Sequence, residues 1–371
     1  MLPIGDGSLE VIPLPPTSQF YLRDNVRMDH SLEPSSALPF SDAIEIVNRG
    51  VDLTVEQTSG LIDSMLSGAA GEDQVGELLL ALKKKGEAVS ELVGAARAMR
   101  RHMTKLPHQH ELLLDTCGTG GSGSGTFNIS TAVAIVTAAC GVPVAKHGNR
   151  KASSLTGSAD VLEVLGVKLE SEPEAVAQRL DEIGICFCFA AKLHPAMRHV
   201  VGVRRKLGVK TLFNLLGPLC NPAGATHQLL GTSSPDAQEK VAAALSQLGT
   251  QRSFVIHAED GQDEVSLDGI THVMKVTAEG CSKMDWSVQD FNLLPAGSEA
   301  LAAKDPQESS EIIQRILQGE PGPCRDTVLA GTAAALLLVD RVASLEEGVR
   351  SAAETIDSGA ATEKLSQLCK D

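Results

Sequence analysis

The chain shows a helical spacing of apolar residues after position 40. Four of them recur at positions i, i+3, i+4 and i+7, which share one face of a helix: Val75, Leu78, Leu79 and Leu82. Upstream, Thr54 and Gln57 form the pattern of a capping box, and downstream Gly86 suits the residue that follows a helix. The segment from about 41 to 105 is therefore predicted to be entirely helical.

The pattern changes at Leu112, where short apolar runs begin to alternate with helical stretches. The runs have the length of strands and comprise residues 112–114, 142–144, 185–189 and 254–256. The helical stretches end at glycines, namely Gly141, Gly166, Gly184, Gly208 and Gly249. Pro173 fits the first position of a helix over 174–183. This alternation predicts an α/β sheet, and two further helices, over 326–342 and 345–358, are expected to close the chain.

The domain organisation follows from these changes of pattern. Residues 1–40 mix proline, serine and other polar residues without a period, so we expect a loosely ordered extension there. Residues 41–108 are predicted to form the first part of a helical domain. Residues 109–371 are predicted to form an α/β domain that binds the substrate and lends some of its helices to the helical domain.

The composition is that of a globular protein, with 43% hydrophobic and 21% charged residues. A net charge of −15 repels polyanions, and 3% aromatic residues leave little material for stacking on nucleic acid bases. No apolar stretch reaches the roughly 18 to 20 residues of a membrane span, and the start lacks the features of a secretory signal. We expect a cytoplasmic protein without nucleic acid or membrane partners. Its eight cysteines form no CxxC pair and are expected to be reduced thiols without zinc.

The most informative segment is DTCGTGGSGSGTFNIST, residues 115–131, between a predicted strand and an apolar helix over 132–140. Five of its residues are glycines: Gly118, Gly120, Gly121, Gly123 and Gly125. Glycines let backbone N–H groups wrap around an anion, and the start of the helix adds its dipole, which predicts a phosphate cradle. The spacing matches neither GxxxxGK[ST] nor a GxGxxG that opens directly into a helix. A flexible linker is the plain alternative.

Two further clusters carry charge. Residues 146–151, KHGNRK, place three cations beside hydrogen-bonding side chains, and the small residues of 153–159 open a helix that suits an anion. A solvated basic turn is the alternative there. Asp263 and Glu264 are adjacent carboxylates that can both reach one hydrated Mg²⁺ if they lie in a turn, and an ordinary surface turn is the competing interpretation.

Together these motifs closely resemble the anthranilate phosphoribosyltransferase family. The resemblance covers about residues 41–369 and rests on GTGG with TFNIST, KHGNR with GSADVLE, HPAMR with VRRKLG, FNLLGPLCNPA, and DGQDEVS, in that order. It implies a small all-helical domain joined to a larger α/β domain with a mostly parallel central sheet, usually as a homodimer. It also implies transfer of a 5-phosphoribosyl group from phosphoribosyl pyrophosphate to the amino group of anthranilate, with release of pyrophosphate, in tryptophan biosynthesis. Mg²⁺ is the implied cofactor.

The resemblance assigns roles to matching positions. For phosphoribosyl pyrophosphate it indicates Gly118, Thr119, Gly121, Asn128, Ser130, Thr131 and Lys146, and we add Ser122, Thr126, Arg150, Ser154 and Ser158 as substrate-binding candidates. For Mg²⁺ it indicates Ser130, Asp263 and Glu264, and for anthranilate Asn149 and Arg204, with His147 and His194 nearby. The catalytic candidates are Lys146, which would stabilise the departing pyrophosphate, and His147, for which an orienting role is preferred over proton transfer.

The chain departs from the family pattern at two places. Ser122 stands where the family usually has Asp after GTGG, which removes a carboxylate beside the diphosphate region. The late apolar helix near Gly331 lacks the usual Asn. Two other functions remain open. A pyrimidine nucleoside phosphorylase would share the fold, but KHGNR and the Asp263–Glu264 pair argue against it. A non-catalytic nucleotide-binding or regulatory protein is favoured only by Ser122.

Overall fold

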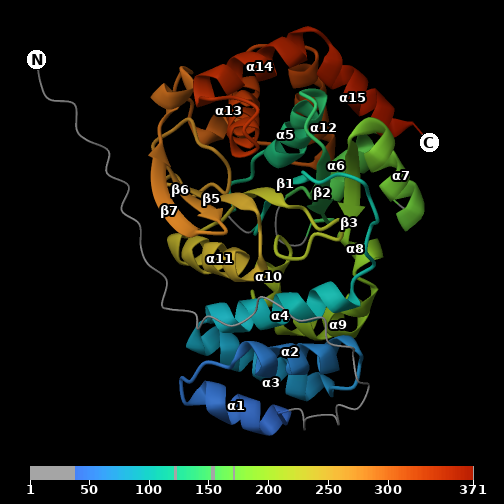
Figure 1. Ribbon diagram of the computed structural model, residues 1–371, viewed down its shortest axis with the longest axis vertical. Helices are drawn as coiled ribbons and strands as arrows, with labels where there is room; N and C mark the ends of the chain where they lie inside the picture. The colour runs from blue at the N-terminus through green and yellow to red at the C-terminus, as the bar shows by residue number, and fades with distance from the viewer. Residues whose placement is uncertain (1–37, 121–122, 152–154, 170–171, 371) are drawn as a thin grey trace, which may run out of the picture.

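The computed structural model describes residues 38–120, 123–151, 155–169 and 172–370. A small helical domain lies against a larger α/β domain, as predicted (Figure 1). The helical domain is formed by α1 (Phe40–Asn48), α2 (Val55–Leu66), α3 (Glu72–Lys85) and α4 (Val89–His102), and by α9 (Arg198–Leu207), which packs against α2 and α3. None of the helices in these described ranges is long and apolar enough to cross a membrane.

The helix signals read from the sequence are confirmed at the level of hydrogen bonds and burial. Thr54 Oγ1 accepts from the backbone N–H of Gln57 at 3.2 Å, and Gln57 Oε1 accepts from the backbone N–H of Thr54 at 2.9 Å, so the capping box at the start of α2 is complete. The apolar face of α3 is buried, and Gly86 ends that helix with a φ of +90°.

A seven-stranded sheet with the order β3-β2-β1-β4-β5-β6-β7 forms the centre of the α/β domain. The strands are β1 (Leu114–Gly118), β2 (Val144–Gly148), β3 (Ile185–Phe189), β4 (His227–Gly231), β5 (Arg252–Ala258), β6 (Thr271–Thr277) and β7 (Gly280–Trp286). The first five strands in chain order are mutually parallel, while β6 and β7 add an antiparallel hairpin to the edge. The predicted α/β class with a mostly parallel sheet is therefore confirmed.

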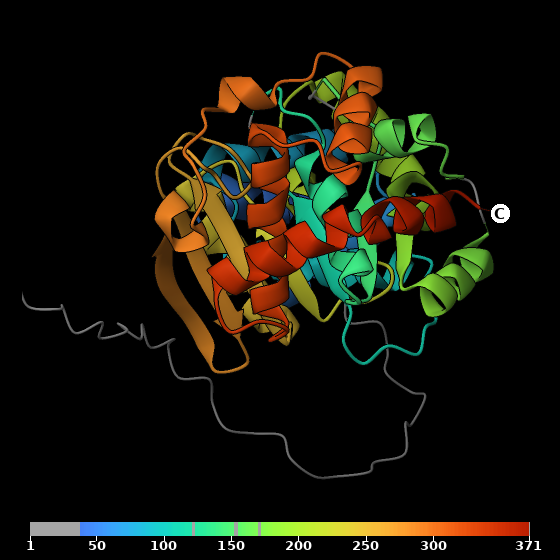
Figure 2. The same ribbon diagram turned by 90° about the horizontal axis from the view of Figure 1, so that it is seen from above.

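Helices cover both faces of the sheet. One face packs under α5 (Ile129–Ala139), α6 (Ser158–Val164), α12 (Pro306–Leu317), α13 (Pro323–Leu338), α14 (Leu345–Asp357) and α15 (Ala360–Cys369), and Figure 2 looks down on the last two. The other face packs on α11 (Pro235–Leu248) and α4, whose apolar residues continue into the helical domain. The remaining helices are α7 (Pro173–Ile183), α8 (Ala190–Leu193) and α10 (Phe213–Leu216), with 3-10 turns at 195–197, 288–291 and 298–301.

Several element predictions were displaced or incomplete. β1 and β2 begin at Leu114 and Val144, the last residues of the predicted runs, and continue through polar residues. In β1 and β2 the apolar runs predict only the first residue of each strand. The polar residues that follow are still buried, because their polar groups bond to one another and not to solvent. The hairpin of β6 and β7, with its single tryptophan Trp286 packed edge-on against Phe254 and Phe291, was not predicted. Three helices, not two, close the chain, because α15 follows α14.

The order of the strands places a crevice at one edge of the sheet. β1 and β4 are neighbours, but α5 follows β1 over one face while α11 follows β4 over the other. The connections therefore diverge at the carboxyl ends of these strands, which is where open α/β sheets bind ligands. Gly118 ends β1, and Gly231 ends β4 beside it.

Candidate active site

A cavity of about 600 Å³ lies at the carboxyl ends of β1, β2 and β4. Twelve of the residues proposed from the sequence line it: Gly118, Thr119, Thr126, Asn128, Ser130, Lys146, His147, Asn149, Arg150, Ser158, Asp263 and Glu264. Three others do not line it, namely Thr131, His194 and Arg204. Gly121, Ser122 and Ser154 lie outside the described residues. Segments that are far apart in sequence thus meet around one space.

The glycine-rich loop leads from β1 to the amino terminus of α5. Gly120, Gly123 and Gly125 have φ angles of +68°, +72° and +66°, which residues with a side chain rarely adopt. At the start of α5, Asn128 is held by Ser309, whose hydroxyl accepts from the Asn128 backbone N–H at 3.0 Å and donates to Asn128 Oδ1 at 2.9 Å. The loop therefore brings glycine backbone to the cavity, as expected of a phosphate cradle, but the backbone N–H groups of Asn128 and Ser130 at the start of α5 are already bonded to Ser309 and Glu264.

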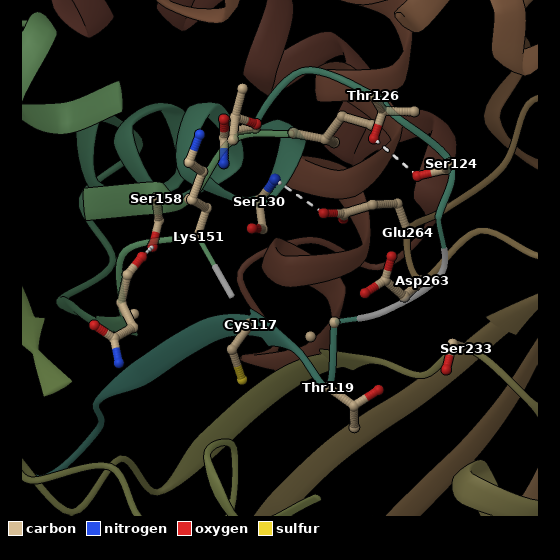
Figure 3. A pocket seen from close by; sticks show the side chains of 18 of the residues that line it. Cys117, Thr119, Ser124, Thr126, Ser130, Lys151, Ser158, Ser233, Asp263 and Glu264 are labelled. Carbon is tan, nitrogen blue, oxygen red and sulfur yellow. Dashed lines mark hydrogen bonds between the residues drawn. The ribbon is translucent and has the colours of Figure 1, made fainter. Parts of the chain in front are cut away.

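Asp263 is fixed by close contacts to two glycines. A Cβ on Gly231 would lie 1.7 Å from the Asp263 carbonyl oxygen, and a Cβ on Gly118 would lie 2.7 Å from Asp263 Oδ2. The loop between β5 and β6 therefore reaches the ends of β1 and β4 only because both positions lack side chains. Figure 3 shows Asp263 and Glu264 side by side at the cavity.

Glu264 points toward the start of α5, where its Oε1 accepts from the backbone N–H of Ser130 at 3.0 Å (Figure 3). Burial, with the negative charge of Asp263, raises the pKa of Glu264 to about 8, and the positive charge of Lys146 opposes this shift. Two carboxylates that repel each other in a buried place suit a divalent cation. Within the described residues no three His, Cys, Asp or Glu side chains form a metal cluster. A cation bound here would therefore take some of its oxygen ligands from the substrate.

Lys146 reaches from β2 across to β1 and α5. Its Nζ donates to the carbonyl oxygen of Thr116 at 2.6 Å and to Ser130 Oγ at 3.1 Å, and the residue is 4% exposed. Burial lowers the pKa of Lys146 from its ordinary value, and the negative charge of Asp115 opposes that lowering. The ammonium group is therefore held in a fixed position beside the proposed metal ligands.

His147 and His194 form a pair of neutral imidazoles. His147 Nδ1 lies 3.0 Å from the Gly217 carbonyl oxygen, so it donates there, and its Nε2 lies 3.2 Å from His194 Nε2, from which it accepts. Burial is the main cause that lowers the pKa of His147 to about 3 and that of His194 to about 4. Both ring nitrogens of His147 are engaged, which favours orientation over proton transfer.

The basic loop after β2 is neutralised in part by its own helix. Arg150 forms ion pairs with Asp160 at 3.2 Å and with Glu163 at 2.8 Å. Asp160 Oδ2 also accepts from the backbone N–H groups of Lys151 and Gly157, so the start of α6 already holds a carboxylate. The second anion approach expected there is therefore occupied by Asp160, while Asn149 and Ser158 still line the cavity.

The three proposed residues that do not line the cavity lie directly behind it. Arg204 Nη2 donates to Asn214 Oδ1 at 3.3 Å, its guanidinium lies over the Phe213 ring, and Asn214 lines the cavity. His194 contacts His147, as described above. Thr131 is buried in α5, and its Oγ1 has no hydrogen-bond partner within the described part of the chain.

The sequence reasoning missed two buried polar residues under the site. Asp115 is fully buried in β1, where it accepts from the backbone N–H of His147 at 3.0 Å and from Asn221 Nδ2 at 2.9 Å. Burial raises the pKa of Asp115, and the charge of Lys146 opposes that shift. Both residues stood within recognised motifs, but only the tertiary structure brings them together. A carboxylate in the middle of a strand was the available signal.

Comparison with known proteins supports this description of the fold. Residues 110–362 match the model of the glycosyl transferase family a/b domain, and residues 41–103 match that of the glycosyl transferase family helical bundle domain. An anthranilate phosphoribosyltransferase of Rhodopirellula baltica is 68% identical over 92% of this chain and 99% of its own length.

Two solved structures are also similar. Anthranilate phosphoribosyltransferase from Thermus thermophilus is 42% identical with a TM-score of 0.83, and the match covers 88% of this chain and 98% of that one. The enzyme from Saccharomyces cerevisiae in complex with PRPP and Mg is 26% identical with a TM-score of 0.82, covering 89% and 96% of the two chains.

Proposed function

The chain belongs to the anthranilate phosphoribosyltransferase family, and from this premise we infer that it transfers the 5-phosphoribosyl group of phosphoribosyl pyrophosphate to the amino group of anthranilate. The reaction releases pyrophosphate and serves tryptophan biosynthesis. One observation in this chain carries the inference. The glycine-rich loop, Lys146 and the Asp263–Glu264 pair line one cavity, where backbone dipoles, a cation and a metal-binding carboxylate pair would together stabilise a diphosphate leaving group.

Phosphoribosyl pyrophosphate binds along the carboxyl edge of β1. We assign its phosphate groups to the glycine-rich loop and the amino terminus of α5, with Asn128, Ser130 and Lys146 as polar contacts. The buried ammonium of Lys146 supports this assignment, because its charge is worth more in a site that excludes water than on the surface. Lys146 stabilises the charge that develops on the departing pyrophosphate.

The residues present fit one or more Mg²⁺ ions. Asp263 and Glu264 supply hard carboxylate oxygens, and Ser130 Oγ lies beside Lys146 Nζ at the same end of the cavity. When bound, Mg²⁺ would neutralise the charge of the diphosphate and help to orient it. The raised pKa of Glu264 supports this role, since a nearby cation would keep that carboxyl group ionised.

The nucleophile needs little help from a base. The aromatic amine of anthranilate is unprotonated near neutral pH, so it attacks the anomeric carbon while the bond to pyrophosphate breaks. His147 and His194 are neutral and hydrogen-bonded to each other. His147 therefore orients the neighbouring backbone and the acceptor substrate, anthranilate. No covalent enzyme intermediate is involved in this scheme.

Anthranilate binds between the α/β domain and α9. Asn149 lines the cavity on the β2 side, and Arg204 lies behind Asn214 on the opposite side. A guanidinium held by one amide oxygen still has donors for a carboxylate, which supports Arg204 as the partner of the anthranilate carboxylate.

The chain is proposed to act as a cytoplasmic homodimer with three parts, namely an extension over 1–40, a helical domain starting over 41–108 and an α/β domain over 109–371. The proposed dimer contact lies on the helical domain, where the exposed apolar side chains are Val51, Leu80, Val201 and Val209. Light scattering of the purified chain measures the oligomeric state.

Turnover of the purified chain tests the proposal. Anthranilate consumption and pyrophosphate release are measured with phosphoribosyl pyrophosphate at a series of Mg²⁺ concentrations. Equimolar, Mg²⁺-dependent turnover is the expected result. Phosphate-dependent cleavage of a pyrimidine nucleoside without anthranilate turnover would instead assign a nucleoside phosphorylase, and binding of nucleotide without any turnover would assign a regulatory protein.

A further inference from the structure

Strand β1 is paired very differently along its two edges. It pairs with β4 at five successive residues, from Leu114 with His227 to Gly118 with Gly231. With β2 it pairs only at Leu114 and Val144, although both strands are fully described. β2 itself pairs with β3 along its whole length. The two central strands therefore separate like a fork toward the cavity.

The register of the fork identifies the main-chain groups that it leaves without their usual partners. Leu114 N–H donates to the Pro143 carbonyl oxygen at 2.9 Å, which sets the ladder. In a parallel ladder the next step would join Thr116 N–H to the Ala145 carbonyl oxygen, and His147 N–H to the Thr116 carbonyl oxygen. Thr116 and Lys146 are not paired in the described strands, so this step of the ladder is incomplete.

Three side chains bond three of the four main-chain groups of this ladder step, all but the Thr116 N–H. Asn221 Nδ2 donates to the Ala145 carbonyl oxygen at 2.8 Å. His147 N–H donates to Asp115 Oδ1 at 3.0 Å. Lys146 Nζ donates to the Thr116 carbonyl oxygen at 2.6 Å. Each of these buried main-chain groups is thus satisfied by a side chain.

The side chains in the fork also hold one another. Asn221 Nδ2 donates to Asp115 Oδ2 at 2.9 Å, and Asn221 Oδ1 accepts from the backbone N–H of Ala223 at 2.9 Å, which fixes the orientation of the amide. Asp115 is 0% exposed and Asn221 is 6% exposed. Both oxygens of Asp115 and both ends of the Asn221 amide are therefore engaged.

We propose that Asp115 and Asn221 are positioning residues of the transfer reaction, which hold the fork between β1 and β2 open and so place Lys146 Nζ between Thr116 and Ser130. The proposal rests on the role of Lys146 in the function proposed above. A closed ladder would bond the Thr116 carbonyl oxygen to the His147 N–H, so that Lys146 would have to share this acceptor.

The composition of the fork supports positioning over stability. A buried polar group that replaces a main-chain hydrogen bond gains little, because the ladder bond would satisfy the same atoms without burying a carboxylate. In an ordinary parallel pair, the two strands would stay hydrogen-bonded to each other along their whole length. The fork instead ends with the ammonium group at the cavity, 3.1 Å from Ser130 Oγ.

Asn221→Ala removes the amide that bonds both Asp115 and the Ala145 carbonyl oxygen of β2, and it tests the proposal. Its matched control is Gln238→Ala on α11, since Gln238 is 5% exposed and its Nε2 also donates to two main-chain carbonyls, Val255 at 2.9 Å and His272 at 2.8 Å. Both variants should lose stability. Only Asn221→Ala should lose kcat/KM for phosphoribosyl pyrophosphate, by about 100-fold, as expected for a displaced catalytic group. KM for anthranilate should stay near its wild-type value.

A double-mutant cycle with Lys146→Met decides whether Asn221 acts through Lys146. If it does, Asn221→Ala costs about 100-fold alone and close to nothing when Lys146 is already Met. Equal losses in both backgrounds, or wild-type kinetics in a folded Asn221→Ala variant, would overturn the proposal. If the alanine variant does not fold, Asn221→Ser, which keeps one donor, is measured in the same cycle. Absence of wild-type turnover would instead reject the proposed function.

Discussion

The two edges of β1 are built from the same five residues but are hydrogen-bonded in different ways. The edge toward β4 is a continuous ladder of main-chain pairs that ends at two glycines, on which Asp263 rests. The edge toward β2 stops after one pair, and side chains fill the gap. Main-chain contacts hold the neighbouring groups in place along the edge toward β4, and side-chain hydrogen bonds do so along the edge toward β2.

The two edges therefore position different charged groups of the site: Asp263 lies at the edge toward β4, and Lys146 lies at the edge toward β2. Asp263 is placed by backbone contact, so the absence of a side chain on Gly231 matters more than any hydrogen bond to its carboxylate. Lys146 is placed by polar contacts with Thr116 and Ser130, so its position depends on the charge and geometry of the groups around it. Substitutions on the two edges should therefore fail in different ways.

The largest effect is expected at the open edge. Lys146→Met keeps the length of the side chain but removes the ammonium group, and kcat should fall by about 10²- to 10³-fold because one preorganised charge at the leaving group is lost. Steady-state kinetics measure this loss. Lys151→Met removes an exposed cation from the following loop and should cost much less. Similar losses in the two variants would mean that burial gives Lys146 no advantage.

Arg204 lies outside both edges of β1, and its substitution provides a further comparison with Lys146. Arg204→Ala should raise KM for anthranilate far more than KM for phosphoribosyl pyrophosphate, since a charge-assisted hydrogen bond to a carboxylate contributes on the order of 1.5 to 3 kcal/mol. KM for each substrate is measured at saturation with the other. Equal rises in both values would show that Arg204 only supports Asn214 and the fold around it.

The closed edge is tested at Gly231. Gly231→Ala would force a Cβ onto the Asp263 carbonyl oxygen, and we expect a loss of about 1 to 3 kcal/mol in the free energy of unfolding, with a weaker apparent affinity for Mg²⁺. Denaturant unfolding and an Mg²⁺ titration of turnover measure the two effects. Gly60→Ala in α2 is the control, because a Cβ there meets nothing within 4 Å and should not destabilise the protein. Matching stability in both variants would contradict the close contact.

Near neutral pH, the smallest effect is expected at the imidazoles beside β2. Burial lowers the pKa of His147 to about 3 and of His194 to about 4, so the unfolded chain binds these protons more readily than the folded one. Stability should be complete above about pH 6.5 and fall as the pH drops toward 4, by roughly 1.4 kcal/mol per pH unit for each histidine.

His194→Gln should make this dependence on pH shallower, because one titrating group is removed while a donor to His147 is kept. Urea unfolding at a series of pH values from 7 to 4 gives the slope, to be compared with the wild-type slope. An unchanged slope would mean that folding does not lower the pKa of His194.

The sequence revealed those parts of the fold and site that depend on local pattern. The capping box at Thr54, the buried stripe of α3 and the glycines of the phosphate cradle each reflect a short-range rule, and each could be predicted. The hairpin of β6 and β7 is also local, since only two residues separate the strands, and it was overlooked. The role of Asp115 depends instead on Asn221, which lies 106 residues away. No local spacing records such a contact.

The position of Trp286 limits what intrinsic fluorescence can report. It is the only tryptophan, it lies buried between Phe254 and Phe291, and residues 41–108 contain neither tryptophan nor tyrosine. Emission during unfolding therefore follows the antiparallel edge of the sheet and is blind to the helical domain, whereas far-ultraviolet circular dichroism follows both. Since one apolar core runs from the helical domain to the sheet, the two signals should change together, and a gap between their midpoints would reveal separate unfolding of the two domains.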